Sequence, residues 1–484
     1  MVFSSPLFLF LFLPVVLTPY LLLPGLRLRN AWLLFFSLVF YAWGEPLFIF
    51  LALGSTLLNY ALGLWLDRTA QAARRKYIVA LAVMLNIGLL GFFKYTNFAV
   101  ANLNAVLTVF HHAPLIVPHV LLPIGISFFT FHALSYIIDV YRRKWPAARN
   151  PADLALYIFF FPQLIAGPIL RWRAIAPQLA QRAVTRAEFA EGVRRFVGGL
   201  AKKMLIANEV AVPVRDIIEL PASQLSGPVA WFGMLCFSLQ IYFDFSGYSD
   251  MAVGLGKMFG FKFLENFRFP YVAQSVSDFW RRWHISLMTW FHDYLYVPLR
   301  GDRCSERRDY FNVLFVFLLC GLWHGASWPF VIWGLYHGIL LVLERTRFGA
   351  VVNRMPRPLR HLYTLLVVML GSVFFRAETF AQAAQFFRAM LGFAPLSATH
   401  QPLARYVTNQ VFWSLVAGCL FSAPLWPWLK AQSSRLANAL PARMQPGAQL
   451  GGYLVELVLN VALLLVSAAW LAGGTYNPFI YFRF

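Results

Sequence analysis

The sequence carries little charge, and acidic residues are its scarcest charged group. Only 13% of its 484 residues are charged, with 20 Asp and Glu against 41 Lys and Arg. Hydrophobic residues make up 60% of the chain and form several runs of roughly 20 residues, the length that crosses a bilayer. So little charge excludes an ordinary soluble protein. We expect an all-α, polytopic transmembrane protein in which residues 1–484 form one domain, with about ten to twelve spanning or re-entrant helices.

Cysteine is scarce as well. The four cysteines, Cys236, Cys304, Cys320 and Cys419, show neither CxxC pairing nor the spacing of zinc ligands. The sequence therefore predicts no disulfide framework and no metal site. The formal net charge is +21. Because Lys and Arg gather in the cytosolic loops of membrane proteins, we attribute this charge to membrane orientation and predict no nucleic-acid partner. An anionic cytosolic cofactor could use the same charges.

Basic residues beside the apolar runs predict the orientation of the chain. The block 31–66 is too long for one span, and it has turn residues at 43–46 and basic residues on both sides. This pattern favours a hairpin with both ends in the cytosol, which places the N-terminus on the outer, periplasmic side. The chain should then cross to an outer loop at 94–120, and a span at 121–141 should lead back.

The segment 152–170 is apolar but is interrupted by two prolines and Gly167, and basic residues lie on both sides. Irregular backbone at membrane depth is tolerated only where protein or a watery cavity covers it. We therefore expect a re-entrant segment that lines a cavity open to the cytosol. Farther on, Thr185-x-x-Glu188 is a capping box, so a helix should begin at Arg186. Its basic, amphipathic pattern predicts that it lies in the cytosolic interface.

One candidate for chemistry is His284, an imidazole in a strongly aromatic stretch. Ser277 is a plausible N-cap for a helix that carries it. Helical spacing would then put Trp280, His284, Leu287 and Phe291 along one face. A polar, titratable ring in such apolar surroundings is costly and is usually retained for function.

The other candidate is His324, which follows Trp323 at the end of an apolar run. Gly321 and Gly325 beside it would permit close approach of a backbone or a ligand. On local sequence alone, however, a structural histidine is the more usual interpretation.

Three other polar residues in apolar segments are interpreted as structural. His132 stands seven residues before Asp139, so the two could share a helix face, and a structural hydrogen bond is the expected role of the imidazole. Asp244 and Asp250 close a span at 228–249, where we expect them to pair with nearby Arg residues or to cap helices.

Longer stretches of the sequence favour a functional role for His284 and His324, because through them the sequence closely resembles the membrane-bound O-acyltransferase (MBOAT) family. The resemblance is to the bacterial branch that contains the membrane subunit of alginate O-acetylation. It includes FWRRWHISLMTWFHDYLYVPL and LWHGASWPFVIWGLYHG and extends over essentially the whole chain. The matching stretches are residues 123–142, 159–169, 242–261, 266–271, 279–299, 322–338 and 476–484. The fold this resemblance implies is a ring of tilted helices with re-entrant segments and a central funnel or tunnel.

The resemblance also implies a function. The later intramembrane histidine of the family is essential and an upstream polar residue assists, roles that fall on His324 and His284 here. Acetyl-CoA would be the acyl donor, and a polysaccharide such as alginate the acceptor. A periplasmic, SGNH-like polysaccharide acetyltransferase would be the partner, and the chain would lie among lipids of the bacterial inner membrane. The residues we expect beside the cofactor are Arg281, Arg282, Trp283 and Trp323.

Three other interpretations remain open at this point. Broken helices and intramembrane histidines also fit a transporter for a polysaccharide or lipid intermediate, although no repeat of two halves is evident. The same fold could transfer D-alanine to teichoic acid from a carrier-protein thioester. The chain could also be a catalytically silent scaffold.

Overall fold

The structure, a computed structural model, describes residues 2–301, 305–394, 399–474 and 477–478. Within those ranges every regular element is a helix, which confirms the all-α class. Cys304 and nearly all of the matched stretch 476–484 lie outside the described residues. No membrane accompanies the chain, so the helices that could span one are identified by their length and composition.

Five of the described helices are long and apolar enough to cross a bilayer. They are α3 (Phe48–Arg68), α4 (Ala72–Val109), α11 (Gly227–Met258), α18 (Arg357–Arg376) and α22 (Gln445–Ala472). A sixth candidate is a pair bent by 62°, α20 (Asn409–Phe421) with α21 (Leu425–Ala439). The expected ten to twelve helices included re-entrant ones, and several other apolar runs fold into shorter helices, namely Phe8–Leu22, Ile126–Tyr141 and Trp328–Glu344.

The remaining α-helices are α1 (Leu13–Leu22), α2 (Leu26–Gly44), α5 (Ile126–Tyr141), α6 (Pro151–Phe159), α7 (Phe161–Leu164), α8 (Trp172–Ala180), α9 (Arg186–Ala201), α10 (Asn208–Ile218), α12 (Val276–Arg282), α13 (Ile285–Phe291), α14 (Val297–Arg300), α15 (Glu306–His324), α16 (Trp328–Glu344), α17 (Arg347–Arg354) and α19 (Phe380–Met390). The expected break between the helices of the 31–66 block is confirmed, because α2 ends at Gly44 and α3 begins at Phe48.

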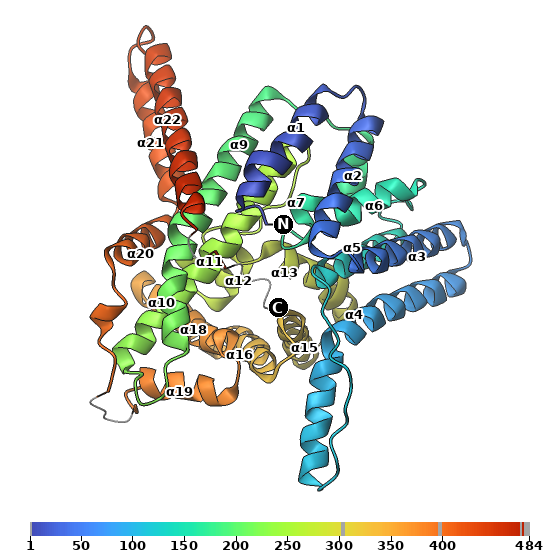
Figure 1. Ribbon diagram of the computed structural model, residues 1–484, viewed down its shortest axis with the longest axis vertical. Helices are drawn as coiled ribbons and strands as arrows, with labels where there is room; N and C mark the ends of the chain where they lie inside the picture. The colour runs from blue at the N-terminus through green and yellow to red at the C-terminus, as the bar shows by residue number, and fades with distance from the viewer. Residues whose placement is uncertain (1, 302–304, 395–398, 475–476, 479–484) are drawn as a thin grey trace.

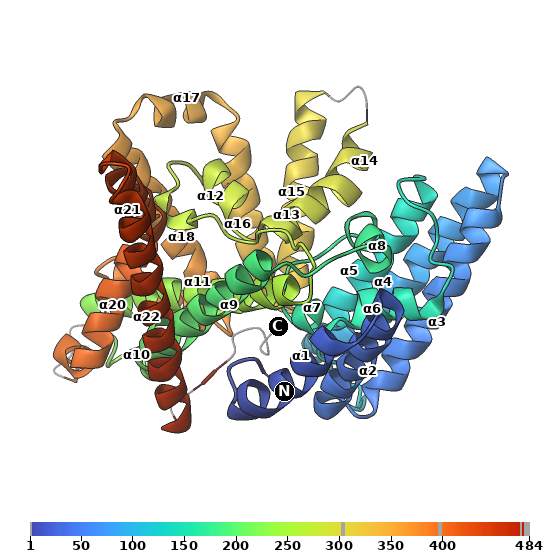
Figure 2. The ribbon, with the colours of Figure 1, turned by 90° about the horizontal axis from the view of Figure 1, so that it is seen from above.

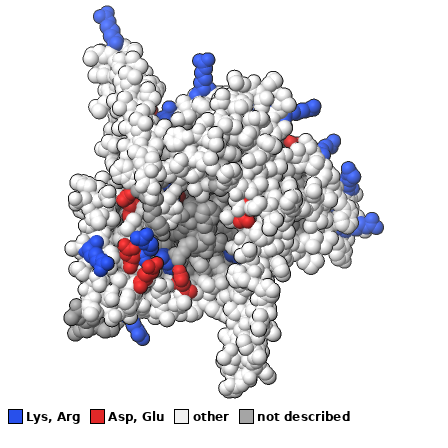
Figure 3. Space-filling model, viewed as in Figure 1, with Lys and Arg blue, Asp and Glu red and all other residues white. Residues whose placement is uncertain are grey.

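The helices surround a central region. In Figure 1, α2 to α6 lie on one side and α10, α16, α18, α19 and α20 on the other, with α11, α13 and α15 between them. In Figure 2, α9 and α11 run through the middle, with α12, α15 and α17 above them and α1 and α2 below. The face seen in Figure 3 is mostly uncharged. Lys and Arg stand mostly at its projecting edges, and a group of both signs lies to the left of the centre.

Residues from distant parts of the sequence meet close to the N-terminus. The amide Nδ2 of Asn477 donates to the carbonyl oxygen of Ser4 at 2.8 Å. Asn208 in turn donates to Oδ1 of Asn477 at 3.2 Å. Segments 473 positions apart are therefore tied to each other and to α10.

The expectation of an outer loop at 94–120 is wrong over most of its length, because α4 continues as a helix to Val109. The sequence offers no Gly or Pro between Gly91 and Pro114 that would end the helix earlier. His111, with φ of 57°, takes the left-handed conformation common just beyond a helix C-terminus.

The capping box at Thr185 is confirmed. The Thr185 hydroxyl accepts a hydrogen bond from the Glu188 backbone N–H at 3.2 Å, and α9 begins at Arg186. The helix does more than lie in an interface, because it packs flush against α11. A Cβ on Gly199 would stand 2.5 Å from the Gly247 carbonyl oxygen, and one on Gly192 would stand 2.7 Å from that of Gly254. The two backbones meet where neither helix has a side chain.

The segment 152–170 is broken as expected. Helix α6 stops at Phe159, and Phe160 takes a non-helical conformation (φ −50°, ψ 110°) before the single turn of α7. Most of the segment is buried, including both prolines and Gly167. A Cβ on Gly167 would lie 2.3 Å from the Cα of Gln163, so only glycine fits that turn. Protein therefore covers this irregular backbone.

Candidate active site

His324 is held at the C-terminal end of α15. Two close glycine contacts fix α15 against α16: a Cβ on Gly321 would stand 2.3 Å from the Phe330 carbonyl oxygen, and one on Gly334 would stand 2.3 Å from that of Phe317. After His324 the chain becomes extended at Gly325 (φ −164°, ψ 146°) before α16 begins at Trp328. The imidazole is thus carried by the turn between two tightly packed helices.

His284 lies in a turn and not within a helix, so the expected helical face through it is wrong. The N-cap of α12 is Ser275, whose hydroxyl accepts from the Asp278 N–H at 3.0 Å, and not Ser277. Helix α12 ends at Arg282, and His284 adopts a left-handed conformation (φ 45°, ψ 51°) before α13. A non-glycine residue rarely adopts this conformation unless its surroundings impose it.

The surroundings that impose this turn centre on Asn266, which is buried. Its backbone oxygen accepts from the Ile285 N–H at 2.9 Å. Its side-chain oxygen accepts from the Ser286 hydroxyl at 2.9 Å, and its Nδ2 donates to Ser249 at 3.0 Å. The Ser286 hydroxyl also accepts from the Ile169 N–H at 2.9 Å, which connects the turn to the segment 152–170. Backbone and side chain together pin the residues on either side of His284.

The two imidazoles are close neighbours in an aromatic enclosure. Their ring centroids are 6.4 Å apart, and the exposed fractions are 0% for His284 and 4% for His324. Phe245 meets His284 edge to face at 4.6 Å. Trp333 and Phe375 approach His324 at 5.0 and 5.2 Å. The two imidazoles therefore lie side by side in mostly aromatic surroundings, and of the two His324 lines the cavities described next.

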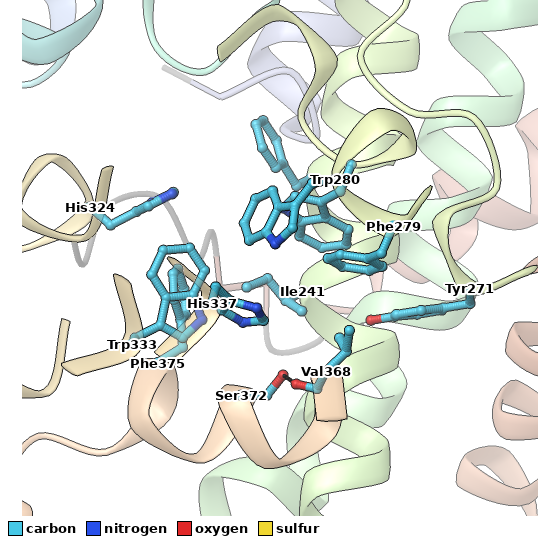
Figure 4. A pocket seen from close by; sticks show the side chains of 12 residues that line it. Ile241, Tyr271, Phe279, Trp280, His324, Trp333, His337, Val368, Ser372 and Phe375 are labelled. Carbon is cyan, nitrogen blue, oxygen red and sulfur yellow. Dashed lines mark hydrogen bonds between the residues drawn. The ribbon is translucent and has the colours of Figure 1, made fainter. Parts of the chain in front are cut away.

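Cavities reach His324 from two directions. The first, which we call the Trp280 cavity, encloses about 550 Å³ and is lined by His324, His337 and mostly aromatic side chains. Figure 4 shows the His324 ring pointing toward Trp280, with His337 below them and next to Trp333. The second, the Lys94 cavity, encloses about 620 Å³ and is lined by Lys94, Trp323, His324, Ile165 and residues 122–128.

A third and larger cavity continues from the second. This wide cavity encloses about 1190 Å³ and shares Lys94 and Leu122 with the Lys94 cavity. Asn97, His119 and Arg376 are among its polar lining residues. His324 thus stands between one aromatic cavity and one that opens toward polar side chains.

The structure brings together four of the six residues expected at the site. His284 and His324 are adjacent, Trp283 lines the Trp280 cavity, and Trp323 lines the Lys94 cavity. Arg281 and Arg282 are not part of this group. They lie at 3.5 and 3.1 Å from Asp278, with 70% and 35% of their side chains exposed, and line none of the three cavities.

Two cavity residues were not selected from the sequence. Lys94 stands in an apolar span as the one charged residue between Lys76 and Asp139, a signal that marks functional positions in membrane proteins. His337 is buried against Trp280 and Trp333, at 5.2 Å from each ring. Nothing in its local sequence distinguishes it from a core histidine.

The predicted pairing with Arg is confirmed for Asp250, whereas Asp244 pairs with a lysine. Asp244 forms a buried ion pair with Lys203 at 2.8 Å. Asp250 pairs with Lys202 at 2.6 Å and with Arg195 at 2.8 Å. These carboxylates hold α11 to α9 and to the turn after it, and they are not part of the site.

The hydrogen bond expected for His132 is absent among the described residues, where both of its buried ring nitrogens lack a partner. Asp139 is engaged elsewhere. It accepts from the Tyr294 hydroxyl at 2.8 Å and from the Arg173 N–H at 3.1 Å. The two side chains therefore do not form the contact that their spacing suggested.

A basic cluster lies close in sequence to the segment that touches the His284 turn. Arg171 and Arg173 approach Asp293 at 2.7 and 3.0 Å. Burial alone would raise the pKa of the Asp293 carboxyl, but the His292 hydrogen bond and the two arginines hold it below its ordinary value. Asp293 therefore stays ionised at neutral pH and neutralises only part of the local positive charge.

Comparison with known proteins gives the class of this chain. The model of MBOAT, the membrane-bound O-acyltransferase family, matches residues 146–379, which include His284 and His324. A relative in Azotobacter vinelandii is 43% identical over 504 residues that cover all of both chains. The chain therefore belongs to the membrane-bound O-acyltransferase family and is an O-acyltransferase. The resemblance seen in the sequence is confirmed.

The relatives narrow the class further. The Azotobacter vinelandii protein is a probable alginate O-acetylase AlgI. So is a relative in Pseudomonas aeruginosa that is 42% identical over 525 residues and all of both chains. A peptidoglycan O-acetyltransferase of Helicobacter pylori is 38% identical over 83% of this chain and 81% of its own length. This chain is therefore similar along its whole length to probable alginate O-acetylases, and over most of its length to a peptidoglycan O-acetyltransferase.

Proposed function

We propose that this chain takes acetyl groups from cytosolic acetyl-CoA and passes them across the bacterial inner membrane for O-acetylation of an exopolysaccharide such as alginate. The observation that carries the proposal is the position of His324 between two cavities. A base with access from two directions can meet a donor on one side and an acceptor on the other. A periplasmic polysaccharide acetyltransferase completes the transfer, and residues 1–484 act as one domain in the ring-shaped fold of the family.

His324 is the base in this proposal. It removes the proton of the acceptor hydroxyl as that oxygen attacks the thioester carbonyl carbon. A C–O bond forms, the C–S bond breaks, and the proton held by His324 passes to the leaving thiolate of CoA. His284, in its fixed turn 6.4 Å from His324, orients the thioester or donates a hydrogen bond to the developing oxyanion. The aromatic enclosure excludes bulk water and so limits hydrolysis of the thioester.

Positively charged residues at the helix ends support the proposed orientation of the chain in the membrane. Helix α15 starts beside Arg307 and Arg308, and α16 ends beside Arg345 and Arg347, which puts both of these ends in the cytosol. His324 lies 18 residues along α15, roughly 27 Å from its cytosolic end at 1.5 Å per residue. The site is then deep in the membrane, and the N-terminus is periplasmic.

The donor enters from the cytosolic side in this orientation. The Trp280 cavity offers aromatic walls for the pantetheine arm and includes Trp283. The phosphates of CoA meet arginines at the entrance. Arg171 and Arg173 are candidates for this contact beside Arg281 and Arg282, because they adjoin the segment bonded to the His284 turn.

Substitution of each histidine tests the proposal. His324→Ala should lower acetyl transfer by roughly 10²–10⁴-fold, the usual contribution of a general base. His284→Ala should lower it as well. The matched control is His112→Ala, which removes an exposed imidazole distant from the cavities. Acetyl ester on the exopolysaccharide is measured in cells that produce each variant, after membrane insertion and folding have been verified. Normal acetylation by His324→Ala would end the proposal.

Labelled donor separates this function from its rivals. Inside-out vesicles that contain the chain and its partner are given [¹⁴C]acetyl-CoA, and the labelled product is identified. Label in an ester on the polysaccharide is expected. A transporter or a silent scaffold would leave the label in CoA. A D-alanyl transferase would need a carrier-protein thioester instead.

A further inference from the structure

Lys94 is a buried lysine that lines the candidate site. Its side chain is 7% exposed and lies in the apolar helix α4. None of the ion pairs formed by the described residues includes Lys94. A buried ammonium without a carboxylate is costly in an apolar environment, so it is retained where its charge has a use.

The contacts of Lys94 lead directly to His324. Its ammonium donates to the backbone oxygen of Trp323, the residue before His324, and lies 5.8 Å from the centre of the Trp323 ring. The next residue of α4, Tyr95, donates its hydroxyl to the Leu322 carbonyl oxygen at 2.8 Å. The last carbonyls of a helix lack partners within the helix, so these two side chains cap α15.

Capping of α15 uses only part of the hydrogen-bonding capacity of Lys94. An ammonium has three N–H donors, and Trp323 is the one hydrogen-bond acceptor found for it among the described residues. Lys94 and His324 both line the Lys94 cavity. The cavity therefore presents a base and a positive charge to a molecule that enters it. Tyr95, the other side chain that caps α15, does not line this cavity.

We propose that the Lys94 cavity is the acceptor site and that the Lys94 ammonium binds the acceptor hydroxyl oxygen. This inference rests on the proposed function and assigns its acceptor side. As His324 takes the proton, negative charge develops on the oxygen, and a cation beside it in a dry site stabilises that charge. The hydroxyl oxygen then forms the ester bond, and CoA leaves with the proton that His324 held. Lys94 remains protonated throughout.

The wide cavity supplies the route for the acceptor. It continues from the Lys94 cavity toward Asn97, His119 and Arg376, groups that can hydrogen-bond to a hydroxyl-rich molecule. In the orientation given by the basic residues, α4 runs from the cytosol outward, and Asn97 and His119 lie toward its outer end. The ligand class is an alcohol of a sugar or of a partner's side chain, approaching from the periplasmic side.

Alcohols of different acidity test this role. Purified chain in lipid nanodiscs is given [¹⁴C]acetyl-CoA and either ethanol or the more acidic trifluoroethanol, and acetyl ester formation is measured. Lys94→Met should lower kcat/KM for ethanol by about 10²-fold, as loss of one oxyanion donor does. The loss should be clearly smaller for trifluoroethanol, whose oxygen needs less stabilisation. Binding of acetyl-CoA should not change.

Two further variants separate charge from capping. Lys94→Gln retains a donor for the Trp323 carbonyl but has no charge, so it should fold well and show the same dependence on alcohol acidity as Lys94→Met. Tyr95→Phe removes the neighbouring cap bond without touching the cavity. It should lower thermal stability and leave the ratio between the two alcohols unchanged.

Each result is decisive. Equal losses for both alcohols in Lys94→Gln would overturn the inference and leave Lys94 as a helix cap. The inference is also overturned if Tyr95→Phe changes the ratio between the ethanol and trifluoroethanol activities as Lys94→Gln does. If the wild-type chain binds acetyl-CoA but acetylates neither alcohol, the proposed acetyl transfer to a hydroxyl fails instead.

Discussion

Asn266 shows how a single side chain can set catalytic geometry without touching a reactant. It holds Ile285 and Ser286 through backbone and side chain, and these residues flank the left-handed turn at His284. The conformation of that turn is unfavourable by itself, on the order of 1–3 kcal/mol. Removal of the anchor should therefore let the turn relax and move the imidazole away from His324.

We expect Asn266→Ala to fold and bind acetyl-CoA but to lose up to about 10²-fold in kcat, the penalty of a displacement near 1 Å. Loss of a buried hydrogen-bonded amide should also lower stability by roughly 1–3 kcal/mol. Thermal unfolding and steady-state kinetics in nanodiscs measure the two effects. Asn104→Ala is the control, because Asn104 also uses both amide atoms, on the loop residue Leu115. Equal kcat values for the two variants would contradict this role.

Among single residues, the two histidines of the site could be predicted from the sequence, whereas the turn at His284 and the role of Lys94 could not. His324 and His284 were selected because their motifs resemble a family, and the structure brings their rings together. The turn at His284 escaped prediction because distant residues, Asn266 above all, impose it against the local helical pattern. Lys94 was overlooked although its lone charge was visible, since its meaning depends on a helix more than 200 positions away.

Among the elements, the crossing of α9 and α11 depends on glycines at matched intervals. Gly192 meets Gly254 and Gly199 meets Gly247, so both helices offer glycine at a seven-residue spacing. Backbones in such contact gain many van der Waals interactions and leave no room for a methyl group. The ion pair of Arg195 with Asp250 lies between the two contacts.

Gly199→Ala should therefore force the helices apart and destabilise the fold by roughly 1–3 kcal/mol, as overpacking does. Gly198→Ala is a control one residue away, since a Cβ there meets nothing within 4 Å. Alanine favours a helix over glycine by up to about 1 kcal/mol, so Gly198→Ala should be neutral or stabilising. Thermal unfolding in one detergent gives both values. A Gly199→Ala as stable as Gly198→Ala would show that the crossing tolerates separation.

Local signals explain which elements could be predicted. The Thr185 cap and the turn residues after Gly44 act within a few positions, and both helix boundaries were foreseen correctly. The partner of α9 could not be foreseen, because its basic, amphipathic pattern equally fits a membrane surface. The broken character of 152–170 was visible in its prolines, whereas its anchoring through Ile169 to Ser286 was not.

For the whole molecule, the basic residues predict which side of the membrane each end occupies. A reporter inserted after His112 should lie outside, and one inserted after Arg354 should lie in the cytosol. Alkaline phosphatase is active only in the periplasm, so it should be active at the first site and inactive at the second. A fluorescent protein that folds only in the cytosol should give the reverse pattern. The opposite pair of results would invert the orientation and exchange the donor and acceptor sides.

Composition predicted an all-helical membrane protein, but it did not show which of the expected spanning or re-entrant helices are long enough to span the bilayer. Length and apolar content cannot distinguish a helix that crosses lipid from one that ends against other protein, as α6 and α7 do. The bend of 62° between α20 and α21 illustrates the same limit, because a single apolar run became two helices.

The bonds that join Asn477 to Ser4 and Asn208 also constrain the order of assembly. A ribosome releases residue 4 into the membrane long before it synthesises residue 477. Helices near Ser4 must therefore wait in the lipid for a segment that is synthesised 473 residues later. Biogenesis of this protein should therefore include a late step, after membrane insertion, in which Asn477 bonds to Ser4 and Asn208. Chains stalled before that step should be good substrates for membrane proteases.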